Sequence, residues 1–175
     1  MTEILVIALG PGDAELLTVK AADALASAGR LLLRTERHGV ASWLKERGIA
    51  YETLDDLYRE AYDFDQLAEI AAEAVLRLAD VTPGVCYGVP DPLADETVIK
   101  LRSLGVKLTV IEGVTHGNAA RARALEAGAC FCESHLTMTA TDMLARGLDP
   151  DLPLIVTEIS SRLLAGDVKL CLLLL

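Results

Sequence analysis

The amino-acid sequence predicts an α/β protein built on a mostly parallel sheet. Short runs of Ile, Leu and Val alternate with longer segments whose apolar residues recur at helical spacing, and glycines or prolines separate them. Hydrophobic residues make up 52% of the 175 residues and aromatic residues only 4%, so the expected core is aliphatic. Strands that alternate with helices in this way favour parallel pairing through helical crossovers.

The first predicted strand covers residues 4–9, an unbroken apolar run. A helix is expected over 16–28, because its apolar residues recur at helical spacing and Gly29 ends the pattern. Further short, apolar strands are expected at 31–33, 85–89 and 108–111. Further helices are expected at 40–47, 66–78, 97–104 and 118–127, three of them closed by a glycine.

The pattern weakens in the last third of the chain. A strand is expected within 130–136, a helix at 139–146, a strand at 153–157 and a final apolar strand at 168–175. The change of character predicts an N-terminal α/β domain at 1–112 and a partial C-terminal α/β domain at 113–175. Because an uncapped apolar strand would end the second domain, we expect a truncated piece of a longer protein. The alternative is an edge strand that completes a dimer.

Charge and hydropathy exclude several classes of partner. The net charge of −10 argues against a nucleic-acid-binding surface, which requires clustered Lys and Arg. No apolar run reaches the ~20 residues of a membrane-spanning helix. The N-terminus enters a strand without a basic leader. We therefore expect a cytoplasmic protein that binds neither nucleic acid nor a membrane.

The four cysteines are interpreted as structural. Cys86 and Cys171 lie in apolar runs, where a thiol behaves as a small hydrophobic side chain. Cys130 and Cys132 lack a second pair of ligands at zinc-like spacing, although His135 is near. No metal is expected, and reduced thiols fit a cytoplasmic location.

Three loops follow predicted strands and carry small or rigid residues: 10–13, 88–93 and 113–117. Ligands of open α/β sheets bind beyond the carboxyl ends of the strands, so these loops together indicate a small-molecule cleft. The alternative reading is ordinary turns, for which Gly, Pro and Asp are the usual residues.

The first of these loops, Gly-Pro-Gly-Asp, differs from two familiar phosphate-binding motifs. Glu15 occupies the third glycine position of the dinucleotide fingerprint, and no Gly-Lys-Ser/Thr follows. Asp13 is expected to cap the next helix.

Polar residues near the other loops have two readings each. Asp91 either receives a hydroxyl or amine of a ligand or closes an Asx turn. His116 either contacts a ligand or lies on the surface. Arg34, Arg37 and His38 form a basic cluster that suits carboxylates or phosphates, or a solvated run of charges. The acidic stretch that follows Tyr51 is interpreted as a loop and helix surface, with metal-binding carboxylates as the alternative.

Several stretches resemble a known family. Residues 4–18, ILVIALGPGDAELLT, resemble the opening signature of the tetrapyrrole (corrin/porphyrin) methylases. Residues 33–38 and 51–58, and more distantly 161–163 and 167–170, resemble one branch, the methylase-like domain fused to a MazG-type nucleotide pyrophosphohydrolase in YabN-like proteins. The resemblance implies S-adenosylmethionine bound in a cleft between two α/β domains, and a homodimer.

The resemblance also implies site residues. The cofactor contacts would be Pro11, Val89, Pro90, Asp91, Ala94, Thr115, His116, Leu136 and Ser160. Arg34, Arg37 and His38 would hold carboxylates of the acceptor. Three departures stand out. Val89 and Pro90 replace two glycines of the family's Gly-Gly-Asp-Pro loop, and Glu112 replaces the proline of its Pro-Gly-Ile/Val-Ser/Thr loop. Arg34 replaces an aspartate common in porphyrin-methylating relatives.

The expected function is that of an S-adenosylmethionine-dependent methyltransferase acting on a small anionic acceptor, tetrapyrroles included. No catalytic base is assigned. The alternative is a non-catalytic domain that binds S-adenosylmethionine or a nucleotide and regulates a fused MazG-type pyrophosphohydrolase. A nicotinamide-binding domain ranks third, because the third glycine is missing.

Overall fold

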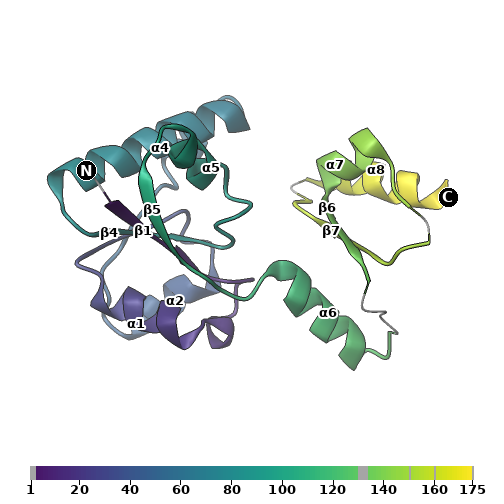
Figure 1. The fold of residues 1–175 in the computed structure, drawn as a ribbon, viewed down its shortest axis with the longest axis horizontal. Coiled ribbons are helices and arrows are strands. Elements are labelled where there is room, and N and C mark those ends of the chain that lie inside the picture. The colour runs from purple at the N-terminus through teal and green to yellow at the C-terminus, as the bar shows by residue number, and fades with distance from the viewer. Residues whose placement is uncertain (1–2, 130–133, 150, 160, 175) are drawn as a thin grey trace. The chain divides into compact units, whose positions relative to one another are not determined.

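The computed structural model describes residues 3–129, 134–149, 151–159 and 161–174 (Figure 1). Contacts between residues divide the chain into two compact units, Met1–Thr115 and His116–Leu175. The α/β class predicted from the sequence is confirmed, and every strand pairing among the described residues is parallel.

The first unit is a five-stranded sheet with strand order β3-β2-β4-β1-β5. Its strands are β1 (Glu3–Ala8), β2 (Arg30–Leu33), β3 (Glu52–Thr53), β4 (Val85–Val89) and β5 (Lys107–Ile111). Its helices are η1 (Ala14–Leu16), α1 (Val19–Ser27), α2 (Gly39–Glu46), α3 (Leu57–Glu60), α4 (Phe64–Val81) and α5 (Glu96–Ser103). The interior strand β1 lies between β4 and β5, and its Ile7 is opposite Gly88 on one side and Ile111 on the other.

Helices cover both faces of this sheet, α1 and α2 on one and α4 and α5 on the other (Figure 1). Successive residues of a strand point to opposite faces, so Ile4 and Val6 pack toward α4 and α5 while Ile7 packs toward α1 and α2. A strand buried on both faces reads as a continuous apolar run, which explains the sequence of 4–9.

Side-chain caps begin most helices of this unit, α3 excepted. The Thr18 hydroxyl accepts from the Ala21 N–H, Asp63 accepts from the Gln66 N–H, and Asp95 accepts from the Val98 N–H. Asp13 caps the short helix η1, as expected from the sequence. Each cap fixes the point at which the chain leaves a loop, and thereby the shape of the loops that carry the site.

The second unit contains the two-stranded parallel sheet β6 (Leu136–Thr139) and β7 (Leu154–Thr157). Its helices are α6 (His116–Glu126), α7 (Ala140–Arg146) and α8 (Arg162–Leu173). Ala140, Met143 and Val168 form its small core, where α7 packs on α8.

Some sequence predictions for these elements were wrong. The predicted C-terminal strand at 168–175 lies mostly within helix α8, which Ser161 caps by accepting from the Leu164 N–H. A short apolar run fits a strand and a buried helix equally well, so periodicity could not separate them. The predicted helix 16–28 is interrupted, because the cap at Thr18 starts α1 anew. Residues 130–133 of another predicted strand, with Cys130 and Cys132, lie outside the described residues.

Helix α5 offers a matched test of the core. The Leu101 side chain is 0% exposed beneath the sheet, whereas Leu104 at the end of the helix is 55% exposed. We expect Leu101→Ala to lower the free energy of unfolding by about 2–5 kcal/mol, because it leaves a cavity. Leu104→Ala should change it by about 0.5 kcal/mol or less. Urea unfolding of both variants measures this, and equal losses would contradict the assigned core.

Candidate functional site

The carboxyl ends of β1, β2, β4 and β5 lie along one edge of the parallel sheet. The loops that follow these strands therefore meet there, as is usual for ligand sites of open α/β sheets. Two pockets open at this edge within the first unit.

The loop after β1 is held close to the start of α2. Gly10 and Gly12 have φ of 77° and 118°, a region that glycine adopts readily. Gly39, the first residue of α2, lies so close that a side chain there would clash with the Gly12 carbonyl oxygen. The two segments therefore pack backbone against backbone.

His38 fastens the same junction. Its Nδ1 accepts from the Val40 N–H at 3.3 Å and so caps α2. Since Nδ1 is an acceptor there, Nε2 carries the proton and donates to the Gly10 carbonyl at 3.0 Å. The imidazole thus joins α2 to the glycine loop with both ring nitrogens.

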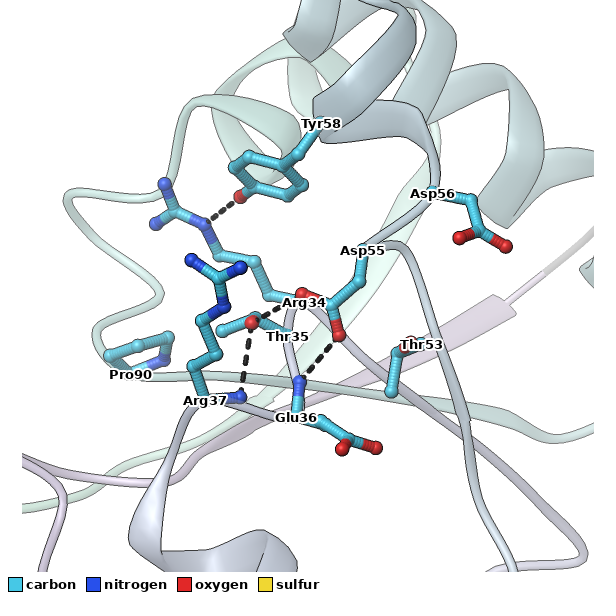
Figure 2. Close-up of a pocket in the computed structure, with 9 residues that line it drawn as sticks. All are labelled: Arg34, Thr35, Glu36, Arg37, Thr53, Asp55, Asp56, Tyr58 and Pro90. Atoms are coloured by element: carbon cyan, nitrogen blue, oxygen red, sulfur yellow. Dashed lines mark hydrogen bonds between the residues drawn. The ribbon is translucent and has the colours of Figure 1, made fainter.

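We call the larger cavity the arginine pocket; it measures about 850 Å³ (Figure 2). Its lining comes from the loops after β2, β3 and β4: Arg34, Thr35, Glu36, Arg37, Thr53, Asp55, Asp56, Tyr58 and Pro90. The structure thus brings two predicted acceptor residues, Arg34 and Arg37, into one pocket.

Arg34 is fixed by several partners at once. Its Nη1 lies 3.2 Å from the Asp95 carboxylate, and its Nε donates to the Tyr58 hydroxyl at 2.5 Å. The guanidinium also stands over the Tyr58 ring, 5.9 Å from the centroid. Burial alone would lower the pKa of Arg34, but Tyr58 and the charge of Asp95 outweigh it and raise the pKa. Arg34 is therefore a rigid, permanently charged group.

Asp55 anchors the loop after β2. Its carboxylate accepts from the Thr35 hydroxyl at 2.6 Å and from the Glu36 N–H at 2.8 Å (Figure 2). Partial burial raises the pKa of Asp55, but these hydrogen bonds and the charge of Arg37 outweigh it. The pKa consequently lies below its ordinary value of 3.8. Asp55 thus remains a carboxylate at neutral pH.

We call the second cavity the proline pocket; it measures about 410 Å³. Its lining is Ala8, Pro90, Asp91, Pro92, Leu93, Arg102, Leu108, Val110, Glu112, Gly113 and Val114. Asp91 closes the predicted Asx turn by accepting from the Leu93 N–H at 3.0 Å. A Cβ at Gly113 would lie 2.6 Å from the Ala8 Cβ, so glycine lets the ends of β1 and β5 approach.

Pro90 lines both pockets. The carbonyls of Val89 and Pro90 accept from the N–H groups of Leu9 and Gly10, at 2.8 and 3.1 Å. These bonds continue the β1–β4 pairing into the loops. The wall between the two pockets is therefore tied to the glycine loop.

Other predicted site residues lie outside these two pockets. Pro11 is in the glycine loop, Val89 is fully buried in β4, and Ala94 is exposed in the turn before α5. Thr115 is exposed at the end of the first unit. Ser160 lies outside the described residues. Each remains a prediction.

The second unit has its own pocket of about 370 Å³. It is lined by His116, Ala120, Ile155, Val156, Thr157, Glu158 and Ile159. Glu158 has a φ of 56°, unusual for a residue with a side chain. Leu136, another predicted cofactor contact, begins β6 in this unit and does not line this pocket.

Three functional side chains, Tyr58, Asp55 and Asp95, were not predicted from the sequence. Tyr58 and Asp55 belong to the stretch interpreted as surface, although the stretch also carried the resemblance to one family branch. Asp95 gave no signal beyond that of a helix cap. Its side chain is 1% exposed and lies beside Arg34 only because the fold joins the two segments.

Two classes of site receive no support in the described part of the chain. No cluster of His, Cys, Asp and Glu there gathers three groups that would hold a metal ion. No helix there has both the length and the apolar character needed to cross a bilayer.

The chain is an α/β protein with a parallel sheet, a glycine loop after its first strand and two pockets at the carboxyl edge of the sheet. The model of the tetrapyrrole (corrin/porphyrin) methylases matches residues 3–162, and the chain belongs to this family. The family consists of S-adenosylmethionine-dependent methyltransferases, and the chain is assigned to that enzyme class. No curated protein matches the chain significantly.

Solved structures share the fold. A putative cobalamin-synthesis-related protein (CobF) from Corynebacterium diphtheriae is 20% identical, with a TM-score of 0.60 over 95% of this chain and 76% of its own. The uroporphyrin III C-methyltransferase of Thermus thermophilus is 24% identical, with a TM-score of 0.57, and the match covers 97% of this chain and 76% of that enzyme. A structure of the Thermus enzyme with S-adenosylhomocysteine is 23% identical, with a TM-score of 0.54, and the match covers 97% of this chain and 72% of that one.

The contact between Gly39 and the glycine loop can be tested by one methyl group. Gly39→Ala forces the Gly12 carbonyl away and should lower the free energy of unfolding by about 2–3 kcal/mol. The matched control is Gly29→Ala, where a Cβ meets nothing within 4 Å, and a change of about 1 kcal/mol or less is expected. Thermal and urea unfolding give both values. Equal stability of the two variants would contradict the tight junction.

The low pKa of Asp55 predicts a pH-dependent stability. A folded-state pKa below 3.8 contributes stability that is present above 3.8 and is lost as the pH falls through the folded value. Asp55→Asn should therefore be less stable than the native chain at pH 7, and the difference should shrink below about pH 4. Thr35→Val removes the hydroxyl that donates to Asp55 and should make stability depend less on pH over this range. Urea unfolding between pH 7 and 3 measures the stability of each variant. A difference from the native chain that does not change with pH would contradict the role of Asp55 in anchoring the loop.

Proposed function

We propose that the chain is an S-adenosylmethionine-dependent methyltransferase that binds its cofactor in the proline pocket and a small anionic acceptor in the arginine pocket. The observation that carries this proposal is Pro90, which lines both pockets. Two molecules bound on either side of one residue would have their reacting atoms close together, and alignment supplies much of the rate of a transfer reaction.

The proline pocket suits the cofactor in size and chemistry. Its volume falls in the usual range for small-molecule sites, and most of its lining is apolar. Asp91 and Glu112 provide negative charge for an amine or a sulfonium, and Arg102 provides positive charge for a carboxylate. Gly113 leaves its backbone open where any other residue would fill the space beside Ala8.

S-adenosylmethionine, when bound, supplies an electrophilic methyl group on a sulfonium. The residues of the chain hold and orient the partners. Arg34, immobilised by Asp95 and Tyr58, shapes the wall of the arginine pocket, while Arg37 attracts an anionic acceptor. His38 supports the glycine loop rather than the acceptor, because both of its ring nitrogens are engaged.

The arginine pocket also supports the YabN-like branch. The two stretches that resemble this branch, 33–38 and 51–58, contribute all of the pocket's lining except Pro90. Residues that resemble one branch therefore form one pocket, as expected if the branch has its own acceptor. A MazG-type pyrophosphohydrolase on the full protein, and a homodimer, belong to the same proposal.

A non-catalytic regulatory domain is the second candidate. Asp55 favours it, because this pocket carboxylate is engaged in holding the loop through the Thr35 hydroxyl and the Glu36 N–H and so is not free to act as a base. Cofactor binding without turnover would favour this candidate over the enzyme.

Calorimetric titration tests the cofactor site. S-adenosylmethionine and S-adenosylhomocysteine should bind with a Kd on the order of micromolar. Asp91→Asn, which keeps the acceptor atom of the Asx turn but removes the charge, should weaken S-adenosylmethionine about tenfold. The weakening follows from losing a charge that faces a cation.

The matched control is Asp63→Asn, which keeps the cap of α4 and lies outside both pockets. It should leave the affinity unchanged. Failure of the native chain to bind either molecule would overturn the proposed cofactor site. An unchanged affinity in Asp91→Asn would show that the cofactor does not bind in the proline pocket.

A further inference from the structure

The lining of the arginine pocket carries more negative than positive charge. Its cations are Arg34 and Arg37, and its carboxylates are Glu36, Asp55 and Asp56. Two neighbours pair with this lining, Lys45 with Glu36 at 3.6 Å and Asp95 with Arg34 at 3.2 Å, and counting both still leaves one more negative charge than positive. Charges at this spacing act on a ligand across about 10 Å at moderate salt. An incoming molecule with many carboxylates would therefore meet net repulsion rather than attraction.

Arg34 has little capacity left for a ligand. Asp95, which is 1% exposed, neutralises its charge at 3.2 Å. Its Nε already donates to the Tyr58 hydroxyl. A carboxylate that approached Arg34 would have to compete with these partners.

Arg37 is different. Among the described residues its guanidinium forms no ion pair or hydrogen bond, and the side chain is exposed at the pocket. In Figure 2 the dashed line at Arg37 ends on its backbone nitrogen, which donates to the Thr35 hydroxyl. The planar guanidinium remains available for the two oxygens of one carboxylate or phosphate.

We propose that the arginine pocket selects an acceptor with one oxyanion group and an apolar body, and that Arg37 is the residue that binds the oxyanion. This inference rests on the proposed function in treating the pocket as the acceptor site. Tyr58 and Pro90 offer apolar surface for the body of such a molecule. The three carboxylates disfavour any acceptor that carries further negative charges.

The test compares three aromatic probes of one ring each. Benzoate and phenyl phosphate carry one oxyanion group, and benzenehexacarboxylate carries six. Titration followed by the NMR shifts of the Arg Nε–H groups gives a dissociation constant for each probe on the native chain. We expect the single-oxyanion probes to saturate at concentrations on the order of millimolar. We expect benzenehexacarboxylate to bind no more tightly than benzoate despite its charge.

Variants separate the two parts of the inference. Arg37→Gln should weaken benzoate about fivefold or more, and Arg37→Lys should give an intermediate affinity, because it keeps the charge but loses the planar fork that binds two oxygens. The double variant Glu36→Gln with Asp56→Asn should strengthen benzenehexacarboxylate about fivefold or more, because it removes two repelling charges. The control Asp23→Asn with Glu46→Gln makes the same change of charge outside the pocket and should have little effect.

Three results would overturn the inference. One is tighter binding of benzenehexacarboxylate than of benzoate by the native chain. The second is unchanged benzoate binding in Arg37→Gln. The third is no saturable shift with any single-oxyanion probe up to about 50 mM. If benzoate binds and phenyl phosphate does not, the oxyanion is a carboxylate, and the reverse result identifies a phosphate.

A separate titration distinguishes failure of the proposed function from failure of this inference about the acceptor. Titration of S-adenosylhomocysteine on the same samples reports on the proline pocket and requires no acceptor. Cofactor binding with the wrong probe preference removes only the inference about the acceptor. The expected probe preference without cofactor binding leaves a selective anion pocket and removes the methyltransferase proposal.

Discussion

The backbone contact between the glycine loop and the start of α2 is the constraint on which the rest of the site depends. Gly39 leaves no room for a side chain against Gly12, and His38 closes the contact through Gly10. The same loop is bonded to the carbonyls of Val89 and Pro90. The residues that precede α2 line one side of the arginine pocket, and those that follow Val89 line part of the proline pocket. A single junction thereby positions the walls of both cavities.

The parallel sheet explains why the two cavities are neighbours. With β1 between β4 and β5 and with β2 beside β4, the loops of four strands meet at one edge. The family supplies this arrangement, and the residues of this chain determine what it recognises. Arg34 pairs with Asp95, and three carboxylates share the lining of the pocket with Arg34 and Arg37. Such a lining differs in charge from one built for a polycarboxylate, so fold membership alone does not define the acceptor.

Local patterns predicted most of the first unit, because its strands and helices are short, regular and punctuated by glycine. Strand β3 has only two residues and carries no periodicity, so it was missed. Helix α8 was taken for a strand, since LCLLLL fits either structure. Within the site, Arg34 and Arg37 were recognised as a cluster. The difference between them was invisible, because Asp95 and Tyr58 reach Arg34 only through the tertiary fold.

A crystal structure of the chain with S-adenosylhomocysteine bound tests the central claim, that adjacent pockets hold different molecules, most directly. The account predicts the ligand against Pro90, Asp91 and Val114, with the arginine pocket left open. A ligand seated on Arg37 and Tyr58 would contradict it, because the pocket assigned to the acceptor would then be the cofactor site.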